Sequence, residues 1–378
     1  MIKLQGQYNE ALVMTDYPDE TTIAQIILLL NQPWIKGSLV RIMADAHAGK
    51  GCVVGYTQTL NGTVVPNLVG VDIGCGIYSY KLFHKDTRKI DFQKLDDHIR
   101  ANIPSGMSVR TKPNRPSAGA TQQIQRLCNK LEIDSGRVFK SLGTLGGGNH
   151  FIEVGEDPMG YYWFTVHSGS RNFGLKTAEY HQDKAKKFIE DSHIRGIPRG
   201  LEYLPMEYGG REYLTDMGTA QYFADLNREF MALEIFRFFD LEADHHNHKS
   251  IKSVHNYIDF NDSIVRKGAI SANQGEQCVI PFNMRDGIAV CRGKGSKKWN
   301  NSAPHGAGRI MSRSKAKQEL TLDEYITTMK GIWSSCVHQS TLDEAPMAYK
   351  DMNEIIEFMT ETVEVLYLIK PVYNFKAS

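Results

Sequence analysis

The segment Tyr161-Tyr-Trp-Phe-Thr-Val166-His167-Ser-Gly-Ser-Arg171 combines a strand signal with a candidate metal ligand. Its first six residues are aromatic or β-branched, which predicts a buried strand. His167 follows that strand directly and precedes three small residues. The apolar runs Leu68–Val71 and Cys278–Ile280 predict two further strands. Because such runs alternate with helical patterns, the sequence predicts a mixed α/β or α+β fold around a central β-sheet.

Helical patterns follow and separate these strands. They predict helices over Thr22–Leu30, Ala120–Leu131, Lys176–Asp191, Thr219–Phe239 and Asp323–Gln339. An apolar content of 41% is enough for a substantial core, and no low-complexity linker or internal repeat divides the chain. We therefore predict a single domain over residues 1–378, with a helical insertion at residues 173–241.

The charge balance does not by itself indicate nucleic-acid binding, since 44 Lys and Arg stand against 43 Asp and Glu. Basic residues are nevertheless concentrated between positions 285 and 317, where Asp286 is the single acid. The basic residues of this strip are Arg285, Arg292, Lys294, Lys297, Lys298, Arg309, Arg313, Lys315 and Lys317. A strip of this kind suits phosphate groups.

The six cysteines lie far apart without a CxxC pair, and no secretory signal precedes them. A disulfide framework is therefore not expected, and a reducing cytoplasm is the predicted location. The apolar run from Ile23 to Leu30 is too short to span a bilayer, so no membrane role is expected. We expect a monomer.

A metal-capable side chain beside Gly or Ser recurs after predicted strands, where loops form ligand sites. The residues in these positions are Asp72, Cys75, His150, His167 and His255. A single histidine near a glycine is usually a plain core or loop residue, but the repetition of one layout in several segments favours a metal site. A thiolate can bridge two cations, and the mixed O, N and S ligands suit a transition metal.

Two glycine-rich motifs offer further chemistry. Gly146-Gly-Gly148 lets backbone N–H groups approach a phosphate, although a simple turn explains the glycines equally well. His305-Gly-Ala-Gly-Arg309 leaves an imidazole accessible to attack phosphorus and carry a nucleotide, with Arg309 and Arg313 available to phosphate oxygens. The alternative for this motif is a buried turn capped by its histidine.

Two other segments remain ambiguous or unpromising. Asp45-Ala-His47-Ala-Gly-Lys50 is either a charged loop whose Lys50 contacts RNA phosphates or a plain turn. Asp244-His-His-Asn-His248 looks like a metal site, yet it follows a charged helix and has no strand behind it. We interpret its histidines as solvent-exposed rather than as ligands.

Taken in order, several motifs resemble the RtcB RNA-splicing ligase family over nearly the whole chain. They are Asp45-Ala-His47, Val71-Asp-Ile-Gly-Cys-Gly76, Gly146-Gly-Gly-Asn-His-Phe151, His167-Ser-Gly-Ser-Arg171, Ser253-Val-His-Asn256, Arg266-Lys-Gly-Ala269 and Ser302-Ala-Pro-His-Gly-Ala-Gly-Arg309. The resemblance implies a single-domain RtcB-like fold and a GTP-dependent RNA ligase. Such an enzyme joins RNA 2′,3′-cyclic phosphate or 3′-phosphate ends to 5′-hydroxyl ends, in tRNA splicing or RNA repair.

The same resemblance implies roles for individual residues. Two Mn²⁺ ions would share Cys75, with Asp72 and His150 on one ion and His167 and His255 on the other. His305 would carry GMP before passing it to the RNA 3′-phosphate. The nucleotide would be contacted by Asn149, Glu153, Arg171, Asn256, Pro281, Phe282, Asn283, Met284, Gly306, Ala307, Gly308 and Lys376. RNA is the implied partner, and an archease-like activator is compatible with the family.

The chain departs from the family pattern around the predicted nucleotide pocket. Pro281-Phe-Asn-Met-Arg-Asp-Gly287 replaces a segment of small residues, and Ile288 stands where a serine is usual. The chain also ends Lys376-Ala-Ser378 rather than Lys-Gly. We therefore expect a divergent branch with an altered pocket. The alternatives are a dinuclear metal phosphoesterase acting on RNA cyclic phosphates and a non-ligating RNA-binding relative.

Overall fold

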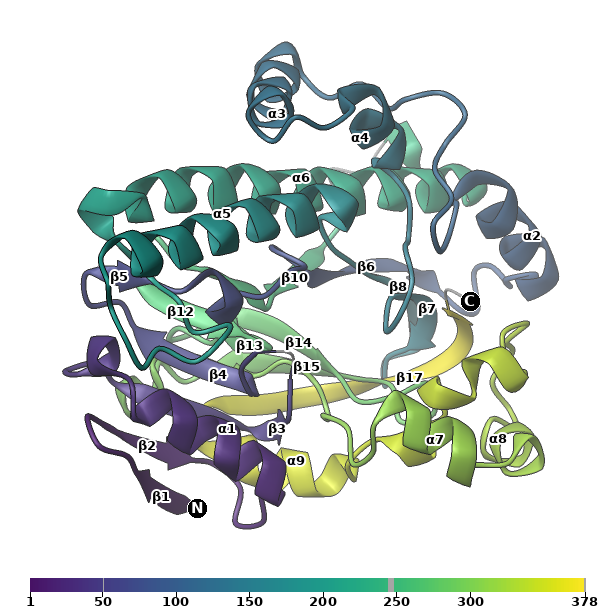
Figure 1. Ribbon diagram of the computed structural model, residues 1–378. Helices are drawn as coiled ribbons and strands as arrows, with labels where there is room; N and C mark the ends of the chain where they lie inside the picture. Colours follow the sequence, from purple (N-terminus) through teal and green to yellow (C-terminus); the bar gives the residue numbers. More distant parts are fainter. Residues whose placement is uncertain (50, 244–247, 377–378) are drawn as a thin grey trace.

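Two large β-sheets form the centre of the structure, a computed structural model that describes residues 1–49, 51–243 and 248–376 (Figure 1). The first sheet has the strand order β1-β2-β3-β4-β12-β11, and only its β2–β3 pair is parallel among the pairs described. Its strands are β1 (Ile2–Gln5), β2 (Glu10–Val13), β3 (Val40–His47), β4 (Val54–Thr59), β12 (Ile264–Lys267) and β11 (Asn256–Ile258).

The second sheet is antiparallel throughout its described pairs and has the order β10-β6-β8-β7-β17-β15-β14. Its strands are β10 (Ser250–Val254), β6 (Gly76–His84), β8 (Tyr161–Ser168), β7 (Phe151–Glu156), β17 (Val363–Lys376), β15 (Ile288–Gly293) and β14 (Gln277–Pro281). Two short pairs complete the strands, β5 (Thr63–Val64) with β9 (Leu204–Pro205) and β13 (Ala269–Ser271) with β16 (Ser302–Pro304). The expected mixture of helices with a central sheet is confirmed.

Helices cover the sheets on more than one side. The long helices α5 (Arg171–Asp191) and α6 (Gly210–Phe238) run side by side across the sheets, and α3 (Ala118–Lys130) packs on α6 (Figure 1). The other helices are α1 (Glu20–Leu30), α2 (Phe92–Asn102), α4 (Ser135–Ser141), α7 (Arg313–Glu319), α8 (Leu322–Thr328) and α9 (Met352–Phe358). Short 3₁₀ turns join several of these elements.

The helices expected at residues 22–30, 120–131, 176–191 and 219–239 are all present, with α6 beginning nine residues earlier than expected. The segment 173–241 contains most of α5 and all of α6, joined through β9 and a 3₁₀ turn, and the two helices contribute buried side chains such as Phe173, Phe223 and Ile235 to the core. The pair is therefore built into the packing of the sheets. That the segment is an insertion remains a prediction.

The helix expected over Asp323–Gln339 is wrong in length, because α8 ends at Thr328. Gly331 takes a φ of 92°, which an α-helix cannot contain. The chain then pairs with β17, since Trp333 N donates to Val372 O and Asn374 N donates to Trp333 O. Tertiary pairing thus overrides the local helical pattern.

The strand expected at Leu68–Val71 is also wrong, because residues Pro66–Leu68 form a 3₁₀ turn. The other two expected strands are present within β8 and β14. No helix in the described ranges is both long and apolar enough to cross a membrane.

Candidate active site

Antiparallel pairing gathers the candidate metal ligands at one end of the second sheet. Gly76 at the start of β6 pairs with Ser168 at the end of β8 and with Val254 at the end of β10. Phe151 at the start of β7 pairs with His167. Side chains just before β6 and β7 therefore meet those at the ends of β8 and β10.

The expected layout, in which each ligand follows a strand, needs a correction. Asp72, Cys75 and His150 precede their strands, whereas His167 closes β8 and His255 follows β10. The candidate ligands still lie together, because antiparallel pairing places the beginning of one strand beside the end of its neighbour.

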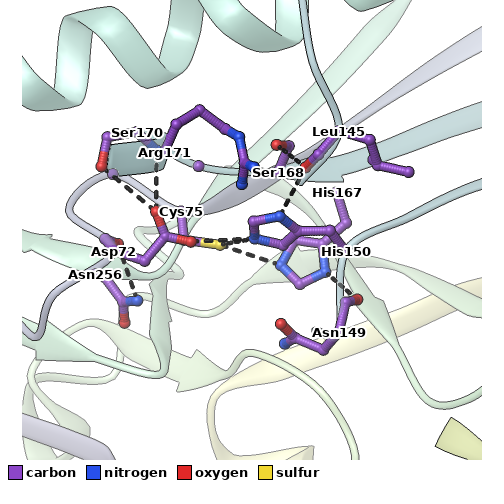
Figure 2. Close-up of polar contacts among 12 residues, drawn as sticks. Asp72, Cys75, Leu145, Asn149, His150, His167, Ser168, Ser170, Arg171 and Asn256 are labelled. Carbon is purple, nitrogen blue, oxygen red and sulfur yellow. Dashed lines mark hydrogen bonds and ion pairs between the residues drawn. The ribbon is translucent and has the colours of Figure 1, made fainter. Parts of the chain in front are cut away.

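The five candidate ligands form two overlapping groups that could each hold a metal ion. Ligand atoms of Asp72, Cys75 and His150 lie within 4.8 Å of one another, and so do those of Cys75, His167 and His255. Cys75 Sγ is 3.5 Å from His150 Nε2 and 3.3 Å from His167 Nε2 (Figure 2). The shared thiol and the mixed donor set fit a pair of transition-metal ions.

Backbone carbonyls orient two of the imidazoles. His150 Nδ1 lies 2.8 Å from Leu145 O, and His167 Nδ1 lies 3.2 Å from Asn149 O (Figure 2). A proton on each Nδ1 leaves the Nε2 lone pair directed at the shared centre. This arrangement of a ligating nitrogen with its partner nitrogen anchored is typical of metal-binding histidines.

Asp72 is held as a carboxylate. Burial alone raises its pKa, but the contact with His150 and the positive charge of Arg171 lower the pKa to about 2. The backbone N–H of Ser170 also donates to Asp72 Oδ1 at 3.0 Å. Burial and the adjacent Asp72 instead raise the pKa of the Cys75 thiol well above its ordinary value. Ion binding there must therefore displace a proton.

Helix α6 supports the turns that carry these ligands, a role that the sequence motifs did not reveal. Arg228 is buried and donates to Gly74 O and Ser168 O, each at 2.7 Å. Asn227 accepts from the backbone N–H of Thr144 at 3.0 Å and donates to Gly169 O at 3.0 Å. Asn227 and Arg228 lie among the buried residues of α6. Two adjacent polar residues on the apolar side of a helical pattern are the signal that could have identified them.

His305 follows β16 and faces the metal cluster. Its ring centroid lies 4.8 Å from that of His255. Its Nδ1 lies 2.6 Å from Asp45 Oδ2, and the backbone N–H groups of His305 and Gly306 also donate to that oxygen. Asp45 lies on β3 and its side chain is fully buried, whereas the His305 side chain is 16% exposed. Asp45 thus anchors one ring nitrogen and leaves Nε2 free to react.

A cavity of about 670 Å³ opens in front of His305, within the usual range for small-molecule sites. It is lined by most of the residues expected to bind the nucleotide: Asn149, Glu153, Pro281, Phe282, Asn283, Met284, Gly306, Ala307, Gly308 and Lys376. His47, Tyr349 and Asn374 also line it, although the sequence did not single out the last two. Arg171 and Asn256 lie on the metal side instead.

The sequence is similar to known proteins over most of its length. The family described as tRNA-splicing ligase RtcB matches residues 25–134 and 128–377. The RNA-splicing ligase RtcB of Escherichia coli (strain K12) is 31% identical over 387 residues, covering 93% of each chain. The chain belongs to the RtcB family. The tRNA-splicing ligase RtcB of Aeropyrum pernix is 27% identical over 402 residues, covering 84% of this chain and 83% of its own.

Arg171 and Asn256 serve structural contacts in this RtcB protein. Arg171 donates to Thr144 Oγ1 at 3.3 Å and to Gly106 O at 3.0 Å. A Cβ on Gly146 would lie 1.6 Å from Arg171 Nη1, so this glycine makes room for the guanidinium. Asn256 donates to Asp72 O at 3.2 Å and accepts from Gly268 N at 3.0 Å. Both residues hold the loops around the metal cluster.

The segment that departs from the RtcB pattern forms a closed turn. Phe282 N donates to Gly287 O at 2.8 Å, and Asn283 Oδ1 accepts from the backbone N–H groups of Arg285 and Asp286. Phe282 is buried, while Arg285 is exposed and paired with Asp286. The larger residues therefore pack inside the turn or point outward. Ile288 begins β15 and is buried.

The basic side chains expected to contact phosphates are held by an acidic pair that the sequence analysis did not single out. Glu344 forms ion pairs with Arg309, Arg313 and Lys376. Asp343 pairs with Arg313 as well. Arg309 is the most tightly held, since it also donates to Met311 O. Arg313 remains 46% exposed and is the better placed of the two arginines for contact with RNA.

Two earlier expectations fall partly outside the described residues. Lys50 lies outside them, as do residues 244–247. For His248, which is described, the expectation of a solvent-exposed side chain is wrong: it is only partly exposed, its Nδ1 lies 3.0 Å from Lys81 O, and its ring packs on Phe236. His248 belongs to neither of the candidate metal groups found in the described ranges.

Proposed function

We propose that this chain is an RNA ligase that joins 2′,3′-cyclic phosphate or 3′-phosphate ends to 5′-hydroxyl ends through GMP carried on His305. Membership of the RtcB family supports RNA ligation, and relatives bear the names RNA-splicing ligase and tRNA-splicing ligase. The proposal rests most heavily on one observation, the 2.6 Å contact of His305 Nδ1 with the buried Asp45.

That contact prepares His305 for nucleophilic attack. With its proton held on Nδ1 by Asp45, the neutral imidazole presents the Nε2 lone pair to the cavity. Nε2 attacks the α-phosphorus of GTP and displaces pyrophosphate. A 2′,3′-cyclic phosphate end is first opened by water to a 3′-phosphate. The GMP then passes to an oxygen of the RNA 3′-phosphate, and a 5′-hydroxyl oxygen, losing its proton, finally displaces GMP to form the new linkage. As the bond to phosphorus forms, positive charge on the imidazolium is balanced by the carboxylate of Asp45.

Two Mn²⁺ ions would be held by the two overlapping ligand groups, one made of Asp72, Cys75 and His150 and the other of Cys75, His167 and His255. Two observations support this assignment: the two ligand groups share Cys75, and the Nδ1 atoms of His150 and His167 are anchored by backbone carbonyls. When bound, such ions supply charge neutralisation for phosphate groups and orient them for in-line displacement.

The nucleotide fits the cavity beside His305. Lys376 is buried at the end of β17, and its Nζ lies 3.0 Å from Glu344 Oε2. We assign base recognition to this end of the cavity, where Glu153 and Asn374 also lie. Phosphates would then extend toward His305 and the metal cluster. A monomer, a cytoplasmic location and an archease-like activator remain predictions.

A dinuclear phosphoesterase is the second candidate, and the metal groups alone would favour it. Hydrolysis of a cyclic phosphate needs water and ions but no nucleotide carrier. Hydrolysis could use the Asp45–His305 pair only to move a proton, whereas the ligase would use its accessible Nε2 to carry GMP. A non-ligating RNA-binding relative would need neither feature.

A single RNA assay separates the three candidates. One RNA carries a 2′,3′-cyclic phosphate, the other a 5′-hydroxyl, and GTP and Mn²⁺ are supplied. The ligase predicts a joined product that His305→Ala abolishes. Conversion of the cyclic end to a 3′-phosphate without joining would identify the phosphoesterase, and unchanged RNA would identify the binding protein.

A further inference from the structure

A second imidazole, that of His47, shares the cavity with His305. His47 closes β3 two residues after Asp45, in a part of the strand where its register with β4 is irregular. Asp45 points toward His305, and His47 lines the cavity in front of that histidine. The sequence motifs that contain His47 had indicated no role for its own side chain.

The same aspartate orients both rings. Its carboxylate Oδ2 lies 2.6 Å from His305 Nδ1, and its backbone carbonyl oxygen lies 2.9 Å from His47 Nδ1. A proton on His47 Nδ1 donates to that carbonyl and leaves Nε2 as the acceptor. No residue of the described ranges forms a hydrogen bond with His47 Nε2. Both histidines therefore line the cavity with Nδ1 anchored, and neither Nε2 has a hydrogen-bond partner among the described residues.

The surroundings of His47 keep it neutral. Burial is the main cause that lowers the pKa of His47, and the charges of His305 and Lys350 lower this pKa further. The carbonyl and carboxylate of Asp45 act in the opposite direction but do not overcome burial. Asp19 at the start of α1 lines the same part of the cavity. A neutral imidazole with an open nitrogen is suited to accept a proton.

The position of His47 also separates it from the nucleotide. His47 belongs to the first sheet, beside Asp19 and Thr21, whereas Glu153 and Lys376 belong to the second sheet. Figure 1 places β3 and α1 on the N-terminal side of the molecule, away from β7 and the end of β17. With GMP at the second-sheet end, the first-sheet end is free for the other RNA strand.

We propose that His47 is the general base of the sealing step and takes the proton of the RNA 5′-hydroxyl. As that oxygen bonds to the activated 3′-phosphorus, its proton moves to His47 Nε2 and the bond to the GMP oxygen breaks. GMP leaves with the electron pair, and His47 then releases the proton to solvent. This assignment rests on the proposed ligase function, but it concerns only the last step.

The test uses the full-length protein and separates the steps. The variant His47→Asn can still donate a hydrogen bond to Asp45 O but cannot accept a proton. The first measurement is the labelling of His305 by α-labelled GTP. The second is the single-turnover joining of a synthetic RNA ending in 3′-pp-5′-G to a 5′-hydroxyl RNA. His248→Asn, which lies outside the cavity, is the matched control.

We expect His47→Asn to label His305 within a few-fold of the parent and to seal the activated RNA about 10²–10⁴-fold more slowly. The parent sealing rate should fall as the pH drops below the lowered pKa of His47, and the variant should lack this fall. Sealing at the parental rate would overturn the proposal. An equal loss of labelling and sealing would also overturn it, since His47 would then act by positioning His305. Failure of the parent to label at all would instead refute the ligase function.

Discussion

At the scale of single residues, Glu153 shows how the cavity constrains an ionisable group. It is buried, and its Oε2 accepts a hydrogen bond of 2.8 Å from Asn374 Nδ2. Burial raises its pKa from 4.5 to about 8, against the opposing effects of Asn374 and Lys376. The folded protein therefore disfavours the ionised carboxylate.

This shift predicts a pH-dependent stability. Because the folded pKa is raised, the stability present below pH 4.5 is lost as the pH rises through the folded pKa, by at most about 5 kcal/mol. Glu153→Gln keeps an oxygen for Asn374 and cannot ionise. In nucleotide-free protein, the unfolding free energy of this variant relative to the parent should increase between pH 5 and pH 8. A difference that stays constant across this range would show that the carboxyl is not held protonated.

Cys75 provides a second residue-scale prediction. Its thiol belongs to both candidate metal groups, so Cys75→Ala should remove Mn²⁺ binding at both sites together with ligation. Equilibrium dialysis with Mn²⁺ measures the bound metal, and His248→Ala serves as the control that retains it. Full activity of Cys75→Ala would contradict a shared thiolate.

At the scale of elements, helix α6 fixes the loops that carry the candidate metal ligands. Asn227 contacts the backbone of Gly143, Thr144 and Gly169, all buried within the structure. Replacing its amide leaves several backbone groups without a partner, and each buried group left unpaired costs about 1–3 kcal/mol.

We therefore expect Asn227→Ala to lower the unfolding free energy by roughly 2–4 kcal/mol, measured by urea denaturation. Metal affinity should fall with it, because the turn bearing Ser168 and Gly169 loses its support. Glu229→Ala on the exposed side of the same helix should change stability by less than about 1 kcal/mol. Equal effects of the two variants would refute the supporting role of Asn227.

The sequence predicted the positions of most helices and strands more reliably than the way these elements place the candidate ligands. Five ligand-type residues could be found because each sits in a motif of distinctive composition. These residues do lie together, but not because each of them follows a strand. Antiparallel pairing of β6 with β8 brings Cys75, just before β6, next to His167 near the end of β8. The pairing of Asp45 with His305 and the role of Arg228 were missed because their partners lie far away in the sequence.

At the scale of the whole molecule, the net charge of +1 provides little attraction for RNA. Affinity must come from local groups, and the residues of the basic strip near the cavity are partly neutralised by Asp343 and Glu344. Phosphates of a bound RNA must compete with these carboxylates. The exposed Arg313, at the start of α7, is the residue best placed to exchange partners.

This arrangement predicts the salt dependence of RNA binding. Arg313→Ala should weaken binding uniformly across RNA sequences and reduce the slope of log affinity against log salt by about 1. Arg211→Ala, an exposed residue in α6, is the control that should leave the slope unchanged. Identical slopes for Arg313→Ala and the parent would exclude contact with a phosphate.

The cavity lies beside His305 and is lined by residues of both sheets, including residues of β7 and β17. We propose that His305 carries GMP at this cavity. The most direct test incubates the pure protein with α-labelled GTP and Mn²⁺, followed by denaturing electrophoresis and mapping of the labelled peptide. We predict acid-labile label on the peptide containing His305, lost in His305→Ala and strongly reduced in Asp45→Asn. Label on another peptide, or none in protein with its metal bound, would contradict the account.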